Sequence, residues 1–173
     1  MMKIKEMCMY ALFAILIGVG AFIKLPISIV PVTMQTLFVV MAGLFLKEKA
    51  IYSVMLYVGM GLIGLPVFAS GGGISYVLVP SFGYLLGFIG AAYFVGKFSS
   101  DNKMRNLIIC CIGMIIIYII GILYFVFIQY AYYGKVFGFV WLVTSLFLVY
   151  LPGDILSIIV AVLIYDRLKK YVV

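Results

Sequence analysis

The sequence has no histidine and very little charge, and these two absences exclude most soluble functions. Charged residues make up only 10% of the 173-residue chain, and five residues are acidic. A soluble domain is about half apolar and a quarter charged, whereas this chain is 68% hydrophobic. A domain of this size cannot bury so much apolar surface away from water. We therefore predict an integral membrane protein that forms one domain over residues 1–173.

The chain also lacks the side-chain sets that catalysis and metal binding need. It has no histidine and no pair of neighbouring acids for acid–base or nucleophilic chemistry. Its cysteines, Cys8, Cys110 and Cys111, have neither disulfide nor zinc-ligand spacing. No ATP-binding motif is present, so any pumping must draw energy from a partner or an ion gradient. We expect no catalytic residue, no metal and no cofactor, and an intramembrane enzyme fits this sequence poorly.

Six apolar segments are candidates for helices that cross a membrane, a crossing that takes about 20 residues. The first resembles a signal peptide but has no typical cleavage site, so we expect a retained helix. The last apolar region is too long for one helix and contains Pro152, a residue favoured in the first helical turn. We therefore expect a shorter helix over 137–150. The prediction is an all-α protein with transmembrane helices over 7–23, 33–46, 50–65, 81–96, 107–127 and 151–170.

The basic residues predict the orientation of these helices. With the N-terminus inside, only Lys24 and Lys135 fall on the outer side. The inner side then carries Lys3, Lys5, Lys47, Lys49, Lys97, Lys103, Arg105, Arg167, Lys169 and Lys170. Because cytoplasmic loops are enriched in Lys and Arg, we expect a multi-pass protein of the cell membrane with both termini in the cytoplasm. The net charge of +7 then reflects topology and not nucleic-acid binding.

Asp154 is the one acid that does not lie among these bases. An acid in the apolar zone is costly and usually marks a substrate or ion path. The alternative is an acid at the outer interface that complements the dipole at the start of its helix. No base lies nearby in sequence to neutralise it, which favours a functional role.

Other polar groups are expected on the same outer side. Thr33 and Gln35 lie at the start of the second span, where Thr33 could instead cap the helix. The run Gly71–Gly73 could bring backbone N–H groups close to a ligand, or could simply be a flexible turn. Together with Asp154, these loops predict a largely apolar pocket with a few converging polar groups, as small-molecule sites have.

Small residues recur along one face of the first span, where a close helix–helix approach is possible in lipid. The face consists of Ala11, Ala14, Gly18 and Ala21. It could serve packing inside the chain or the docking of another membrane subunit.

Four motifs together resemble the BioY family, the biotin-binding S components of energy-coupling factor (ECF) transporters. They are PVTMQTL at 31–37, GLIGLPVFA at 61–69 with the following glycines, PSFGYLLGF at 80–88 and LPGD at 151–154. The resemblance covers nearly the whole chain. It implies the ECF S-component fold, capture of biotin from outside, and two kinds of partner: a transmembrane coupling subunit and two cytoplasmic ATPases that alone use ATP. It also implies that the small-residue face docks on the coupling subunit.

The resemblance also suggests roles for individual residues. Asp154 can accept both N–H groups of biotin's ureido ring, and Gln35 or backbone N–H groups can serve its carbonyl or its carboxylate end. The sulfur-containing ring would lie among Phe68, Tyr76 and Tyr84. The sequence departs from the family at Ser157, where a lysine is usual, at Phe82, and at Ser70 in the glycine run. The alternatives are an S component for another small acidic vitamin and a solitary small-molecule carrier.

Overall fold

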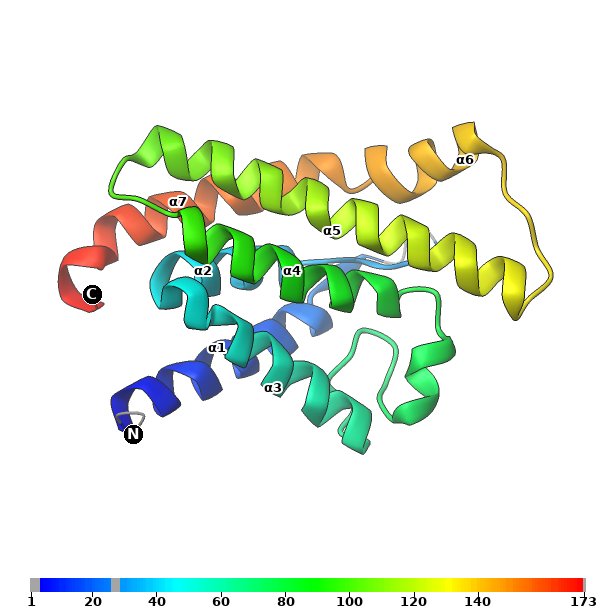
Figure 1. Ribbon diagram of the computed structural model, residues 1–173, viewed down its shortest axis with the longest axis horizontal. Coiled ribbons are helices and arrows are strands. Elements are labelled where there is room, and N and C mark those ends of the chain that lie inside the picture. Colours follow the sequence, from blue (N-terminus) through cyan, green and yellow to red (C-terminus); the bar gives the residue numbers. More distant parts are fainter. Residues whose placement is uncertain (1–3, 26–28, 173) are drawn as a thin grey trace.

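The apolar runs fold into helices, in which every backbone N–H and C=O group can be satisfied within the segment itself. The computed structural model describes residues 4–25 and 29–172 and is nearly all α-helical (Figure 1). Its helices are α1 (Ile4–Phe22), α2 (Gln35–Leu46), α3 (Ala50–Ile63), α4 (Phe82–Phe98), α5 (Lys103–Ala131), α6 (Phe139–Val143) and α7 (Leu151–Val172). Lys3, one of the basic residues predicted on the inner side, lies outside the described residues.

Three segments of the described chain are long and apolar enough to cross a membrane: Ile4–Phe22, Lys103–Ala131 and Phe139–Tyr171. Phe82–Phe98 is a shorter apolar helix. With 12 and 14 residues, α2 and α3 are each only about 20 Å long. The membrane character of the chain is therefore confirmed, while a count of six transmembrane helices stays a prediction.

Shorter elements connect the helices. Two two-residue strands, β1 (Lys24–Leu25) and β2 (Val32–Thr33), pair antiparallel between α1 and α2. Two 3₁₀ helices, η1 (Lys47–Lys49) and η2 (Ile74–Leu78), precede α3 and α4. The short helix expected before Asp154 is α6 followed by a π-helical turn, η3 (Thr144–Leu148). Helix α7 begins at Leu151, which places Pro152 in its first turn. The long apolar region is therefore divided into two helices at the position predicted from Pro152.

Helices α4 and α5 approach each other closely through glycine. A Cβ atom at Gly87 would lie 2.8 Å from the Cα atom of Ile117, and one at Gly121 would lie 2.8 Å from the ring of Tyr84. Another at Gly113 would lie 2.7 Å from the side chain of Val95. Since real Cβ atoms do not come so close, these positions fit no side chain without movement, as expected where helix backbones meet in lipid.

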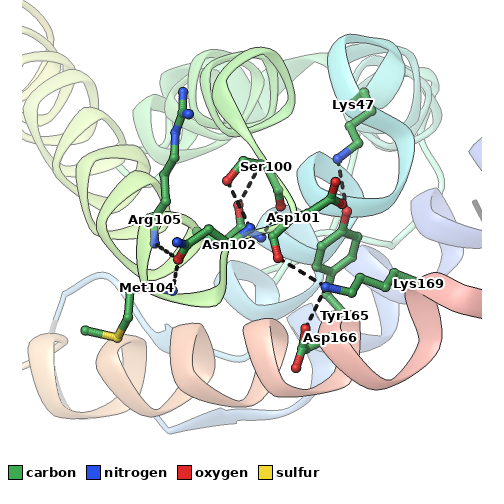
Figure 2. A network of polar contacts seen from close by, with 10 residues as sticks. Lys47, Ser100, Asp101, Asn102, Met104, Arg105, Tyr165, Asp166 and Lys169 are labelled. Carbon is green, nitrogen blue, oxygen red and sulfur yellow. Dashed lines mark hydrogen bonds and ion pairs between the residues drawn. The ribbon is translucent and has the colours of Figure 1, made fainter.

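A polar network ties together the end of the molecule at which α7 ends and the α4–α5 loop lies (Figure 2). Lys47 Nζ donates to Ser99 Oγ (3.1 Å) and to Tyr165 Oη (3.0 Å). Lys169 Nζ donates to the carbonyl of Asp101 and pairs with Asp166 at 2.8 Å. The first turn of α1 and the last turn of α7 lie at this same end (Figure 1).

Candidate functional site

A narrow cavity lies at the opposite end, where the α1–α2 and α3–α4 connections meet α4, α5 and α7. The space within it that the centres of water-sized molecules can reach is about 40 Å³. A larger ligand must therefore displace side chains or a loop to enter. The lining is mostly apolar and aromatic with a few polar groups: Val30, Pro31, Thr33, Gln35, Thr36, Ala69, Tyr76, Ser81, Tyr84, Leu85, Phe88, Ile117, Tyr118, Tyr150 and Asp154.

Asp154 is the only charged residue among the described residues that line this cavity. It lies in the first turn of α7, is 7% exposed, and its own N–H donates to the carbonyl of Tyr150 (3.0 Å). The Tyr118 hydroxyl donates to Asp154 Oδ2, and the Thr36 hydroxyl also hydrogen-bonds to this side chain. A carboxylate can accept about four hydrogen bonds. Asp154 thus retains the capacity to accept N–H groups from a ligand.

Gln35 and Thr33 line the cavity as part of a buried polar chain. Gln35 Nε2 donates to Tyr57 Oη (2.8 Å), and Tyr57 in turn donates to the carbonyl of Val67 (3.2 Å). Thr33 Oγ1 donates to Gln35 Oε1 (3.1 Å). Helix α2 begins at Gln35 after Met34, which makes no side-chain cap. The amide of Gln35 is therefore held in a fixed orientation by groups from α3 and β2.

We expect Tyr57→Phe to lower the free energy of unfolding by about 1–3 kcal/mol, because it leaves the buried Nε2 of Gln35 without its acceptor. Thermal unfolding of the purified protein in detergent measures the change. Tyr93→Phe is the control, since Tyr93 is 41% exposed and its hydroxyl accepts a long hydrogen bond from Lys97 (3.5 Å). Equal stability of the two variants would contradict a structural role for the Gln35–Tyr57 hydrogen bond.

The aromatic rings of the cavity are fixed by their own hydroxyl groups. Tyr84 Oη donates to the carbonyl of Leu146 (3.2 Å), and Tyr150 Oη donates to the carbonyl of Val30. The hydroxyls of Tyr76 and Ser81 lie 3.1 Å apart. These hydrogen bonds attach the rings to the α1–α2 connection and to the π-helical turn. The rings are therefore held in place as walls of the cavity before a ligand binds.

Five of the residues predicted for the site come together here: Thr33, Gln35, Tyr76, Tyr84 and Asp154. Phe68 does not line the cavity. It is 1% exposed and packs behind it, edge-on to Tyr57 (5.5 Å between ring centroids) and 4.5 Å from Tyr76. Ser157 follows Asp154 by three residues and is turned about 60° around the helix. It lines an apolar groove between α7 and the two strands, which adjoins the cavity at Thr33.

The glycine run also lies away from the cavity lining and packs against the end of α3. Gly73 N donates to the carbonyl of Gly61 (2.7 Å), and Gly71 N to that of Phe68 (3.2 Å). Gly71 and Gly73 have φ angles of 121° and 101°, which favour glycine. A Cβ atom at Gly72 would lie 2.1 Å from the carbonyl oxygen of Leu65. Here the glycines are needed for a turn and a close backbone approach.

The small-residue face of α1 requires a correction. Ala14 and Ala21 have no exposed surface, Gly18 is buried with Tyr57 and Val67 as its nearest neighbours, and Ala11 is half-buried. A fully buried side chain cannot contact another subunit. The face serves packing within the chain, because α1 lies against α2 and α3, and the prediction that it is a docking surface is wrong for these three residues.

Sequence reasoning missed Tyr118, Tyr150, Thr36 and Ser81 as lining residues. Tyr118 contacts Asp154 directly, from the middle of the long apolar helix α5. A signal was present, because a tyrosine hydroxyl in the middle of such a helix needs a hydrogen-bond partner. The sequence does not say, however, which of the other helices supplies that partner.

Comparisons with known proteins agree on one family. The sequence matches the BioY family over residues 1–173. It is 46% identical over 124 residues to a probable biotin transporter BioY of Lysinibacillus sphaericus, which covers 69% of this chain and 63% of that protein, just under two thirds. It is 34% identical over 174 residues to the biotin transporter BioY of Thermotoga maritima, covering 96% of both.

A solved structure gives the same result for the fold. The crystal structure of the S-component for biotin from an ECF-type ABC transporter superposes with a TM-score of 0.81 at 29% sequence identity. The match covers 96% of this chain and 92% of the other. Since the family match spans the whole sequence, this chain belongs to the BioY family.

Proposed function

We propose that this chain is a membrane-embedded S component that captures biotin from the outer side for ATP-driven uptake by an ECF transporter. The relatives described above are named as biotin transporters, and the similar crystal structure is that of a biotin S-component. The observation that carries the proposal in this chain is Asp154, a buried acid in a narrow aromatic cavity with no lysine or arginine among the described lining residues.

The chemistry of the cavity matches the ureido ring of biotin, which offers two N–H donors and one carbonyl. The carboxylate of Asp154 accepts both N–H groups, a strong charge-assisted arrangement. The hydroxyl of Ser81 can donate to the carbonyl while it accepts from the hydroxyl of Tyr76. The rings of Tyr84 and Phe88 pack against the apolar bicycle, while Gln35 is already bound to Thr33 and Tyr57 and supports the wall.

The proposed topology and partners are those that the BioY family implies. The chain forms one domain of six transmembrane helices in the cell membrane, with both termini in the cytoplasm and Asp154 near the outer surface. A transmembrane coupling subunit and two cytoplasmic ATPases supply the energy, so this chain itself carries no cofactor and performs no catalysis. The location of the basic polar network at the end opposite the cavity supports this orientation.

Binding of labelled biotin to the purified protein in detergent tests the proposal. We expect saturable binding that unlabelled biotin displaces and that other small acidic vitamins displace only at much higher concentration. Tighter displacement by another acid would identify an S component for that vitamin instead.

A second measurement separates an S component from a solitary carrier. We expect the chain to co-purify with the coupling subunit and ATPases of its own cell. Rapid ATP-independent uptake of biotin by vesicles that contain this chain alone would contradict the proposal that partner subunits are needed for transport.

A further inference from the structure

The cavity accounts for the hydrogen-bond donors of the proposed substrate but not for its negative charge. Its lining, within the described chain, contains an acid and no lysine or arginine. A substrate carboxylate near Asp154 would be repelled, so it must lie at the far end of the ligand, where a cation can pair with it. At the cavity end, the connections between described helices carry two basic residues, Lys24 and Lys135.

Lys24 lies at the rim of the cavity. Strand β1 places it directly opposite Thr33, which lines the cavity, and opposite residues of an antiparallel pair have neighbouring side chains. Its ammonium donates to the carbonyl oxygen of Ala69, another lining residue. The ammonium of Lys24 therefore lies beside two lining residues of the cavity, and Lys24 itself lines the adjoining apolar groove, which shares Thr33 with the cavity.

The ammonium of Lys24 can also be reached by a ligand. The residue is exposed, and the contact with Ala69 uses one of three N–H donors. Ala69 itself offers a neutral acceptor, so a carboxylate is a stronger partner for the remaining donors. Lys135 differs, because the hollow that it lines with Gln129, Val136 and Phe137 shares no residue with the Asp154 cavity, whereas the groove lined by Lys24 shares Thr33 with it.

We propose that Lys24 binds the carboxylate of the substrate at the mouth of the cavity and thereby makes the site selective for acids. This inference rests on the proposed function, in which the substrate is biotin. The ligand then lies with its ureido ring at Asp154 and its carboxylate at Lys24, so that each end meets a group of opposite polarity. The hydrogen bond from Lys24 to Ala69 also connects the α1–α2 and α3–α4 connections. The bound carboxylate then contacts the same ammonium group that holds these two connections together.

Dissociation constants for biotin and for biotinamide, which lacks the negative charge, test this role in the full-length protein. We expect Lys24→Met to weaken biotin binding by about tenfold or more, the loss of one charge-assisted contact. Binding of biotinamide should change by less than about twofold. Lys24→Arg should keep most of the affinity for biotin, and the matched control Lys135→Met should bind both ligands as the unaltered chain does.

Two results would overturn the role of Lys24. An equal loss for biotin and biotinamide would show that the residue only holds the two connections together, and no loss for either ligand would show that it takes no part in binding. Failure of the unaltered chain to bind biotin is a different result, because it refutes the proposed function on which the inference rests. Size-exclusion chromatography in detergent should show Lys24→Met as a single folded species. Misfolding is then excluded as the cause of any loss of affinity.

Discussion

Asp154→Ala is expected to weaken biotin binding by about 100-fold or more. The variant removes an acceptor for two N–H donors, and each charge-assisted hydrogen bond contributes about 1.5–3 kcal/mol. It also leaves the hydroxyl of Tyr118, which now donates to Asp154, without its acceptor in a buried cavity. Titration with labelled biotin in detergent measures the dissociation constant directly.

The matched control is Asp166→Ala, at the opposite end of the same helix. Asp166 pairs with Lys169 at 2.8 Å, and its side chain is 42% exposed, so its removal should leave biotin affinity within about twofold. Asp154→Asn separates charge from shape, since the amide keeps one acceptor oxygen and should bind more weakly than aspartate. Unchanged affinity in Asp154→Ala would exclude Asp154 as the ligand-binding acid.

Gly96→Ala is expected to be the most destabilising of these substitutions. A Cβ atom there would lie 2.0 Å from the carbonyl oxygen of Lys47 and 2.3 Å from its carbonyl carbon. Lys47 has a φ angle of 56° and anchors the polar network with Ser99 and Tyr165, so its backbone cannot shift freely. Overpacking of this kind should cost about 3 kcal/mol or more, which lowers the thermal midpoint in detergent by about 10 °C.

Gly59→Ala controls for the glycine substitution itself. Gly59 lies within α3, and a Cβ atom there would have no neighbour within 4 Å. Alanine is favoured over glycine inside a helix by about 1 kcal/mol, so this variant should be as stable as the original chain or slightly more stable. A Gly96→Ala protein that unfolds at the original temperature would show that α4 and η1 can separate without cost.

The sequence predicted the positions of the helices well because the apolar runs have clear ends. Pro152 marked the start of the last helix, and Asp154 was identified because a single acid among apolar residues has few structural explanations. Residues that depend on neighbours distant in the sequence were harder to predict. Nothing in the order of residues says that Tyr118 faces Asp154, or that Ser157 turns toward a different groove.

The small-residue face of α1 illustrates the same limit. Its spacing correctly indicated a close helix–helix approach, but spacing does not identify the partner. Ala14, Gly18 and Ala21 pack inside the chain, whereas the surface of α1 that remains exposed carries larger residues such as Leu12, Ile15 and Val19.

The close approach of α4 and α5 has a mechanical consequence for ligand entry. Tyr84 and Tyr118 stand on these two helices, and the contacts at Gly87, Gly113 and Gly121 leave no clearance for one helix to slide along the other. Helices α4 and α5 therefore keep a fixed position relative to each other. A ligand larger than the cavity therefore gains room from side chains or from the described parts of the connections that carry Thr33 and Ala69, and not from a separation of α4 and α5.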